Sequence, residues 1–405
     1  MALGWGWGRA TDVIRFTRSG LDSVQRTQDD DQNAYNVRTS ESPDSNDETT
    51  MTNTSTPKTG TTMTDDTTRA ADDQHTLPTR MPAVVHRTYG AGEVVEQTQL
   101  DVPTPGAGEV LVEVKAAALN ALDWHFLTGT PYVLRVQNGV RRPKRIVPGA
   151  DVAGRIVALG PDVTDFAVGD EVFGEGSGGG CASFVSVKVT GIVPKPVGVT
   201  FQNAAATPVA GLTALQGLRT HADLQPGEHV LINGAAGGVG TFAVQIAKAL
   251  GAEVTAVCSG RNVDMVRAIG ADNVVDYTID DITIGGPRFD VMLDNVGNHT
   301  PKQVLGMLRP TARFVAVSGP KEGRWLGPIA HVVRTAIAFR RAEPSFHQFV
   351  AEARHDDLTT LAEWLANGTL VPQIDRVIGL DGVAAALAEI GGGHTRAKIL
   401  VDPSR

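Results

Sequence analysis

A stretch near the middle of the chain, residues 229–262, constrains the fold more than any other segment. It reads as a short apolar strand, a glycine-rich turn, a mostly apolar helix over 239–250 closed by Gly251, and a second strand over 253–258. Such a turn brings bare backbone up to a pyrophosphate, and the N–H groups of the following helix then face the phosphates. The stretch therefore predicts a dinucleotide-binding unit rather than an ordinary glycine turn.

The turn itself supplies the first group of candidate cofactor-binding residues. Its glycines follow the spacing GxxGxxG rather than the commoner GxGxxG, so the surrounding strand and helix carry much of the argument. The candidates in the turn are Gly234, Gly237, Gly238, Val239 and Gly240.

The tip of the second strand indicates which dinucleotide is bound. An acid about twenty residues past the glycines usually holds the 2′-hydroxyl of NADH, whereas a 2′-phosphate favours hydroxyl groups and Arg. The tip here contains Ser259, Arg261 and Asn262 and no acid, so NADPH is favoured over NADH. Alternatively, Arg261 is a solvated residue at the start of the next helix.

Length and composition limit the class of protein. A chain of 405 residues can form two domains, and no apolar run reaches the about 18 residues that span a bilayer. The mildly acidic net charge of -9 argues against nucleic acid as a partner. Only two cysteines, Cys181 and Cys258, favour a reducing, cytoplasmic location.

The polar N-terminal region, residues 1–80, is predicted to be disordered. Thr supplies 11 of the 20 residues over 49–68, and almost nothing apolar is available to bury. We expect order to begin near Met81.

The ordered chain divides into a β-rich part and an α/β part. In the first, strands are expected over 83–85, 92–96, 109–114, 151–159, 171–173 and 182–189. A helical stretch over 202–221 leads into the dinucleotide unit. Further strands are expected over 273–275, 289–293 and 313–317, with helices over 263–269 and 301–308 between them. This alternation predicts a doubly wound parallel sheet. A helical region over 331–364 and a last strand over 398–401 complete the pattern.

Several separated motifs together resemble the medium-chain dehydrogenase/reductase superfamily, in its zinc-free quinone oxidoreductase-like branch. They are NALDW at 120–124, PGADVAGRIVALGPDVTDFAVGDEVFG at 148–174, PVAGLTAL at 208–215, NGAAGGVG at 233–240 and LDNVG at 293–297. The resemblance implies a GroES-like catalytic domain over 81–207, a Rossmann domain over 208–344 and a C-terminal return to the first domain over 345–405. It also places the active site between the two domains and implies a homodimer.

The resemblance further implies that the catalytic zinc is absent. The zinc-dependent alcohol dehydrogenases of the superfamily carry Cys where Asn120 stands here, and a His-Glu pair where Ala150 and Asp151 stand. A zinc ion needs Cys, His or acidic ligands presented together, and these positions do not supply them.

Without a metal to lower the pKa of an alcohol, reduction of an electrophilic acceptor is the favoured reaction. We expect NADPH-dependent hydride transfer to a quinone or an α,β-unsaturated carbonyl compound, a small-molecule electrophile. Two alternatives stay open: a zinc-dependent alcohol or aldehyde dehydrogenase, and a non-catalytic NADPH-binding or scaffold protein.

Three residues are candidates for the catalytic site. Asn120 can donate a hydrogen bond to the acceptor's oxygen, although an Asn that fixes a turn is the alternative. Asp123 is interpreted as a carboxylate that orients its neighbours or the cofactor. Tyr132 can donate a hydrogen bond or a proton, or it is a packed aromatic residue.

The remaining cofactor candidates lie at the carboxyl ends of the predicted strands, where ligands of such sheets bind. The resemblance places Tyr277 at the adenosine phosphate pocket, and the strand ends place the others near the nicotinamide. These candidates are Asn295, Val296 and Ser318, with Thr213 as a residue whose alternative role is packing.

Two basic stretches have no assigned role. The loop Arg141-Arg-Pro-Lys-Arg145 either selects an anionic substrate or is simply solvated. The stretch 331–341 combines basic and apolar residues at helical spacing, and a lid or dimer helix is preferred over membrane contact.

Overall fold

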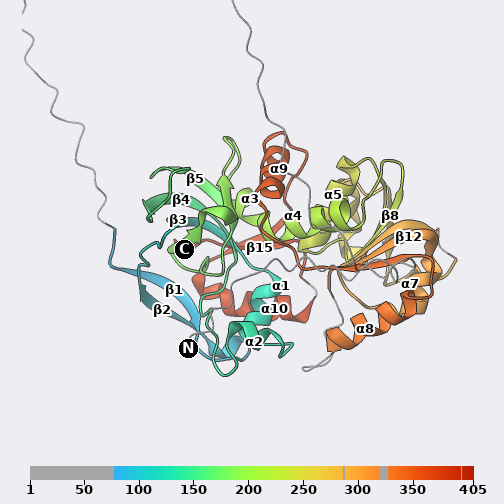
Figure 1. The fold of residues 1–405 in the computed structure, drawn as a ribbon, viewed down its shortest axis with the longest axis horizontal. Helices are drawn as coiled ribbons and strands as arrows, with labels where there is room; N and C mark the ends of the chain where they lie inside the picture. The colour runs from blue at the N-terminus through green and yellow to red at the C-terminus, as the bar shows by residue number, and fades with distance from the viewer. Residues whose placement is uncertain (1–76, 286–287, 319–326, 394) are drawn as a thin grey trace, which may run out of the picture. The chain divides into compact units, whose positions relative to one another are not determined.

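In the computed structural model, the described residues are 77–285, 288–318, 327–393 and 395–405 (Figure 1). They form two sheets with their covering helices, plus a separate pair of strands. The predicted disordered tail lies outside the described residues, except for its last four positions. The first strand, β1 (Arg80–His86), begins one residue before the expected start of order.

The β-rich part is built on a seven-stranded sheet with the order β14-β15-β3-β4-β5-β7, to which β6 adds by pairing with β3. Strand β1 pairs antiparallel with β2 as a separate two-stranded sheet. The strands are β2 (Val95–Asp101), β3 (Glu109–Ala118), β4 (Asp151–Leu159), β5 (Glu171–Glu175), β6 (Phe184–Lys188), β7 (Ile192–Pro194), β14 (Ile374–Ile378) and β15 (Lys398–Val401). Its helices are α1 (Ala121–Thr128), α2 (Leu134–Asn138) and α10 (Val383–Gly392).

The α/β part is a six-stranded sheet in which all neighbouring strands are parallel, with the order β10-β9-β8-β11-β12-β13. This topology confirms the predicted doubly wound sheet. Its strands are β8 (His229–Asn233), β9 (Glu253–Cys258), β10 (Asn273–Asp276), β11 (Phe289–Asp294), β12 (Leu308–Ala316) and β13 (Ser345–Gln348). The helices are α3 (Phe201–Ala206), α4 (Pro208–Leu215), α5 (Gly238–Ala249), α6 (Val263–Ala268), α7 (Pro301–Met307), α8 (Gly327–Phe339) and α9 (His355–Ala366).

The last strand of the chain returns to the β-rich part, as the resemblance implied. Strand β15, drawn in red in Figure 1, pairs antiparallel with β3, which precedes it by more than 270 residues. All four residues of β15 are buried, so the charged side chain of Lys398 at its start is removed from solvent. This return places a C-terminal side chain beside residues from the first part of the chain.

Two sequence-based predictions of local structure were wrong. The strand expected over 92–96 is instead a 3-10 turn, Gly92–Val94, and β2 begins only at Val95. The region 331–364 contains a strand between its helices, because β13 pairs with β12. The helical stretch predicted over 202–221 is confirmed, although it is divided at Thr207 into α3 and α4 and ends in a π-helical segment, Gln216–His221.

The domain boundary predicted at residue 344 falls directly before β13, which belongs to the parallel sheet. The pattern SFHQ is too short to show a clear periodicity, and pairing with a neighbouring strand decides its conformation.

Among the described residues, no helix combines the length and the apolar character that a membrane-spanning segment needs. Helix α8 covers most of the basic stretch 331–341, and the proposed lid or dimer role of that stretch stays a prediction.

The largest core cluster surrounds the dinucleotide unit, where α5 and α4 pack with strand β8. Helix α5 has a continuous buried run from Gly240 to Ala247, and Phe242 within it is completely buried. The core therefore fixes the helix whose N-terminus carries the glycine turn.

We predict that Phe242→Ala lowers the free energy of unfolding by about 3–5 kcal/mol, because it leaves a cavity in this core. Chemical denaturation monitored by circular dichroism measures the change. Val197→Ala is the control, since Val197 is 100% exposed and its truncation should change stability by no more than about 0.5 kcal/mol. Equal stability losses in the two variants would contradict the assigned core.

Candidate active site

A buried ion pair stands where the sequence lacks the zinc ligands. The Nζ atom of Lys398 lies 3.0 Å from Oδ2 of Asp151 and donates a hydrogen bond to Oδ1 of Asn120 at 2.6 Å. The side chains of Lys398 and Asp151 are 2% and 0% exposed. Removing two charges from water is unfavourable unless their remaining hydrogen-bonding groups are satisfied, and Asn120 contributes to that here. Three chain segments distant in sequence therefore meet at one polar cluster.

Asn120 is held by the start of helix α1. Its own backbone N–H donates to Oδ2 of Asp123 at 2.8 Å, which forms a capping box at the first helical turn. Its side-chain amide donates to Oδ2 of Asp151 at 2.9 Å and more distantly, at 3.5 Å, to the carbonyl of Ala118. The sequence offered a turn-fixing Asn and a substrate-facing Asn as alternatives, and the capping geometry shows that Asn120 has the first function at least.

Asp123 ties the same cluster to the loop before β4. Its second oxygen, Oδ1, accepts from the backbone N–H of Gly149 at 2.8 Å. Burial raises the pKa of this carboxyl to about 6, although the two backbone N–H groups that it accepts from oppose the shift. Its contacts are those of a residue that positions Asn120 and the loop.

Asp151 also connects the two parts of the molecule. Its Oδ1 atom accepts from the backbone N–H of Val209 at 2.8 Å, at the first turn of α4. Helix α4 packs in the core of the dinucleotide unit. One carboxylate thus joins β4, β15 and the helix that leads into the parallel sheet.

The glycine turn after β8 lies directly beside β15. The backbone N–H of Ala397 donates to the carbonyl of Ala236 at 2.8 Å. A Cβ atom built on Gly238 would lie 3.2 Å from Cδ of Lys398. The aliphatic stem of Lys398 therefore passes next to the turn, and the ion pair and the predicted cofactor-binding backbone are neighbours.

Two glycines of the turn have conformations or neighbours that exclude other residues. Gly234 has a φ of +76°, in the left-handed region. A Cβ atom on Gly240 would lie only 2.2 Å from the carbonyl oxygen of Gly234. Gly237 is the N-cap of α5, with Gly238, Val239 and Gly240 as its first residues. The turn has the tight strand-to-helix geometry that a dinucleotide pyrophosphate requires.

A hydrogen-bond network joins the ends of β8 and β11. Oδ1 of Asp294 accepts from the side chain of Asn233 at 2.9 Å and from the backbone N–H groups of Val296 and Gly297 at 3.0 and 2.9 Å. The Asn295 side chain donates to the Asn233 carbonyl at 3.1 Å. The network fixes the loop 295–297 against the glycine turn.

Two observations place the remaining candidates of this edge. The buried Oδ1 atom of Asn295 has no hydrogen-bond partner among the described residues, so it can accept from a bound amide such as that of a nicotinamide. The backbone N–H of Ser318 donates to the Asp294 carbonyl at 3.4 Å, which brings Ser318 to the same edge. Thr213 donates to the Val209 carbonyl within α4 at 2.6 Å.

At the adenosine end, the structure adds an acid that the local sequence did not show. Ser259 is the N-cap of the 3-10 turn Gly260–Asn262 and accepts from the buried Asn262 side chain at 3.1 Å. A Cβ atom on Gly260 would lie 2.4 Å from Oδ2 of Asp276, at the end of β10. Arg261, which follows Gly260, and Tyr277, which follows Asp276, are both exposed. The strand tip thus has a carboxylate beside it after all.

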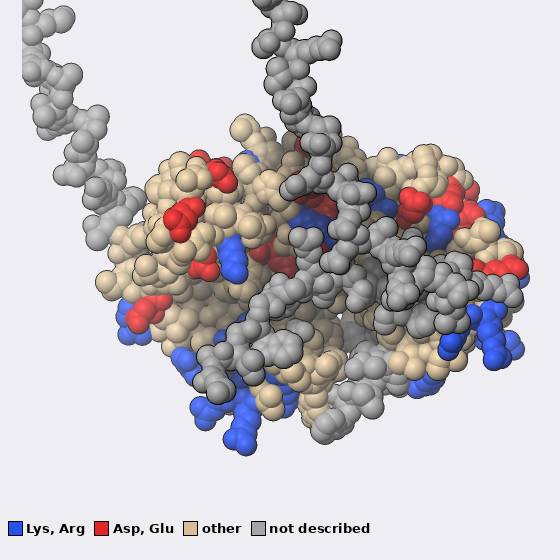
Figure 2. Space-filling model, in the orientation of Figure 1, with Lys and Arg blue, Asp and Glu red and all other residues tan. Residues whose placement is uncertain are grey.

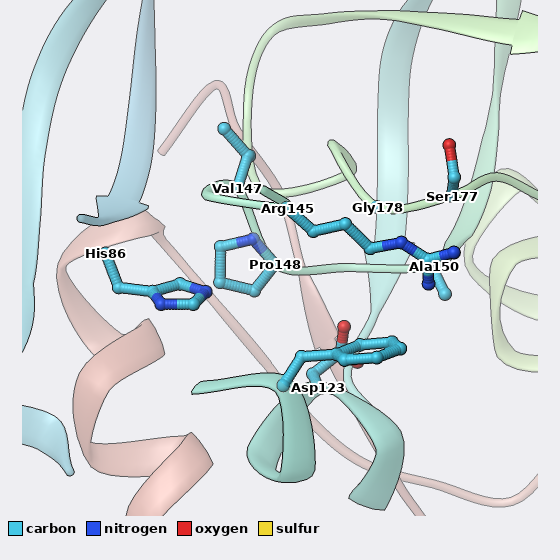
Figure 3. A pocket seen from close by; sticks show the side chains of 9 residues that line it. His86, Asp123, Arg145, Val147, Pro148, Ala150, Ser177 and Gly178 are labelled. Carbon is cyan, nitrogen blue, oxygen red and sulfur yellow. The ribbon is translucent and has the colours of Figure 1, made fainter. Parts of the chain in front are cut away.

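A small pocket opens on the β-rich side of the cluster, next to Asp123. Figure 3 shows its side chains: Arg145 crosses it toward Ala150 and Ser177, and His86 faces Pro148. His86 is buried, and this burial lowers its pKa. Tyr132 lies outside the lining residues, half-buried, with the Arg135 guanidinium 4.4 Å from its ring centroid.

Lys398, Glu175 and Asp276 were missed by the sequence-based reasoning. The sequence did contain a signal for Lys398, since a lysine stands at the start of a short strand that is otherwise entirely apolar. Glu175 had none, because only the antiparallel register of β4 and β5 places it opposite Asp151. Asp276 becomes a neighbour of the strand tip through the pairing of β10 with β9, in which it lies opposite Cys258.

We predict that Gly240→Ala weakens dinucleotide binding by at least tenfold, because its methyl group would displace the Gly234 carbonyl and open the turn. Fluorescence titration with NADPH measures the affinity. Gly306→Ala in α7 is the control, since a Cβ atom there meets nothing within 4 Å. Unchanged affinity in Gly240→Ala would show that the turn does not bind the cofactor.

A second prediction concerns Glu175 and pH. Burial raises the pKa of its carboxyl to about 7, helped by the negative charges of Asp151 and Asp123, while the charges of Arg145 and Lys398 oppose the shift. A raised pKa means that the folded protein holds a proton which the unfolded chain releases near pH 4.5, so stability falls as pH rises from about 4.5 to 7.

Glu175→Gln cannot ionise and should remove this loss. The variant should therefore gain stability relative to the wild type as pH rises from 5 to 8, by on the order of 2 kcal/mol. Thermal unfolding at the two pH values measures the difference. A stability difference that does not change with pH would contradict the shifted pKa.

Comparisons with known proteins agree with this architecture. Residues 106–217 match the family model for an alcohol dehydrogenase GroES-like domain, and residues 269–401 match the model for a zinc-binding dehydrogenase. The chloroplastic quinone-oxidoreductase QR1 of Triphysaria versicolor is 31% identical over 347 residues, covering 80% of this chain and 98% of that protein.

A second relative and a solved structure support the same family. The mouse mitochondrial NAD(P)H oxidoreductase RTN4IP1 is 32% identical over 358 residues, covering 80% of this chain and 89% of that protein. The solved structure of the quinone oxidoreductase from Coxiella burnetii has a TM-score of 0.71 at 27% identity and covers 80% of this chain and 99% of its own. The chain is therefore an oxidoreductase with a nicotinamide cofactor, and it belongs to the medium-chain dehydrogenase/reductase superfamily, in its quinone oxidoreductase-like branch.

Proposed function

We propose that this protein is a zinc-independent, NADPH-dependent reductase that transfers hydride to a quinone or to an α,β-unsaturated carbonyl compound. The observation that carries the proposal is the Lys398 ammonium group bound between Asp151 and Asn120. This cation would repel a divalent metal at the same point, and the oxygens that face it are already engaged. No group of three or more His, Cys, Asp or Glu side chains within the described ranges is placed to hold a metal ion.

The missing ligand set favours reduction over alcohol oxidation. A metal ion would polarise an alcohol oxygen and lower its pKa, and these residues offer nothing equivalent. A quinone or an enone is already electrophilic and needs only hydride and a proton. One matching family model is described as a zinc-binding dehydrogenase, whereas the residues Asn120, Ala150 and Asp151 of this chain do not suit zinc. The quinone oxidoreductases among the relatives support the same choice of acceptor.

The bound nicotinamide would supply the hydride. The chain's own residues would stabilise the negative charge that develops on the acceptor's oxygen. The second N–H of the Asn120 amide has only the long contact of 3.5 Å to Ala118, so it can turn to the acceptor. The Lys398 ammonium group, which donates to Oδ1 of Asn120, polarises that amide and would stabilise the developing anion. Tyr132 stays the candidate for the proton, and Asp123 holds Asn120 in place.

The preference for NADPH rests on Ser259 and Arg261 at the tip of β9. A hydroxyl and a guanidinium suit a 2′-phosphate, whereas the Asp276 carboxylate beside Gly260 opposes it. The Oδ1 atom of Asp276 accepts from the backbone and the hydroxyl of Thr278 at 3.0 and 2.8 Å, which lowers the pKa of this carboxyl and keeps it charged. We retain NADPH as the proposed cofactor on the hydroxyl and the guanidinium at the strand tip, with Asn262 and Tyr277 completing that end of the site.

The proposal predicts that chelator-treated protein oxidises NADPH in the presence of ortho-quinones or enones. The rate of NADPH loss at 340 nm is the measurement, and NADH in place of NADPH should give a lower kcat/KM. An alcohol with NADP is the reverse control. Alcohol oxidation that zinc restores, without reductase activity, would replace the proposal by a zinc-dependent dehydrogenase. Tight NADPH binding without any turnover would favour a non-catalytic protein.

A further inference from the structure

The loop between α2 and β4 presents unbalanced positive charge at the pocket. Arg141, Arg142, Lys144 and Arg145 are all exposed, and none has a carboxylate oxygen within 4.0 Å in the part of the chain that the structure describes. Two exposed arginines elsewhere on the β-rich part, Arg87 and Arg155, are paired with Glu96 and Glu171. Basic side chains gather without acids at the lower left of Figure 2, where Figure 1 shows α2. In a protein of net charge -9, this concentration is unusual.

The loop that carries these charges is fixed rather than loosely solvated. The buried side chain of Asn138 accepts from the backbone N–H of Arg145 at 3.0 Å, and the Tyr89 hydroxyl donates to the Gly139 carbonyl at 2.6 Å. Gly139 has a φ of +109°, and a Cβ atom there would lie 2.1 Å from the Arg142 carbonyl oxygen. The backbone therefore folds tightly on itself and fixes the points from which its basic side chains extend.

Arg145 extends from this loop into the pocket. Its guanidinium carbon lies 4.6 Å from the ring centroid of Phe126, and Figure 3 shows the side chain pointing toward Ala150 and Ser177. A guanidinium that lies over an aromatic face keeps its N–H groups at its edges, where they can form paired hydrogen bonds with a carboxylate or phosphate. Arg145 lines the same pocket as Asp123, which contacts Asn120.

Charges of both signs meet at this pocket. Asp123 and Arg145 both line it, and Asp123 belongs to the cluster in which Lys398 pairs with Asp151. An anionic group would be repelled by the carboxylate of Asp123 and attracted by Arg145 and the exposed basic residues of its loop. The arrangement would orient an anionic acceptor with its charged group toward Arg145.

We propose that the natural acceptor carries an anionic group, a carboxylate or a phosphate, which Arg145 binds at the pocket while Arg141 and Arg142 attract it from solution. The inference rests on the proposed reductase function and narrows its substrate class. Uncharged quinones would then be poorer substrates than anionic ones of the same reactivity.

The test compares two ortho-quinones that differ by one anionic group, 1,2-naphthoquinone and 1,2-naphthoquinone-4-sulfonate. The quantity measured is the ratio of kcat/KM for the sulfonate to kcat/KM for the neutral quinone, with NADPH as the donor. In Arg145→Gln this ratio should fall about tenfold, and in Arg145→Lys, which keeps the charge but cannot form the paired hydrogen bonds, it should fall less. In the double variant Arg141→Gln/Arg142→Gln it should also fall. In the wild type it should decrease with added salt.

The matched control is Lys302→Gln, which removes an exposed charge from α7 that has no carboxylate within 4.0 Å in the described residues. Its ratio should equal that of the wild type. An unchanged ratio in Arg145→Gln and in the double variant would overturn the inference while leaving the reductase function intact. A change confined to the KM for NADPH would assign the loop to the cofactor and also overturn it. Failure of the wild type to reduce either quinone would remove the proposed function and the inference together.

Discussion

The ion pair between Lys398 and Asp151 is the contact on which the arrangement of the site depends. Both side chains are buried, and each makes further hydrogen bonds. Lys398 donates to Asn120, and Asp151 accepts from Asn120 and from the first turn of α4. Leaving one of the two charges buried without the other would be strongly unfavourable. The pair therefore holds β15, β4 and α4 in one mutual position, and that position sets the distance between the catalytic candidates and the glycine turn.

Electrostatics at the site follow from this crowding of carboxyl groups around a single cation. Asp123 and Glu175 have raised pKa values because they are buried and lie close to the negative charge of Asp151. Lys398 offsets part of that charge but also takes up the oxygens that a metal would need. A fixed ammonium group stabilises developing negative charge without exchanging with solvent, which suits an acceptor that becomes an enolate or a hydroquinone anion.

The sequence predicted the dinucleotide unit well because its signals are local: an apolar strand, obligatory glycines and an amphipathic helix. The parallel sheet and the final strand were predicted for the same reason. Residues defined by pairing between distant strands were not predictable. Glu175 joins the site through the register of β4 and β5, and Asp276 reaches the strand tip through β10 beside β9. Strand β13 was read as helix because four residues carry too little periodicity and its partner strand decides its conformation.

The return of β15 to β3 also determines when the site can form. Asn120, Asp151 and the glycine turn are synthesised long before Lys398, and the turn is bridged to Ala397 at the same place. Until residue 398 leaves the ribosome, the buried carboxylate of Asp151 has no countercharge. A chain shortened before β15 would keep every glycine of the dinucleotide motif, yet it would lack both the cation that pairs with Asp151 and the strand that lies beside the glycine turn.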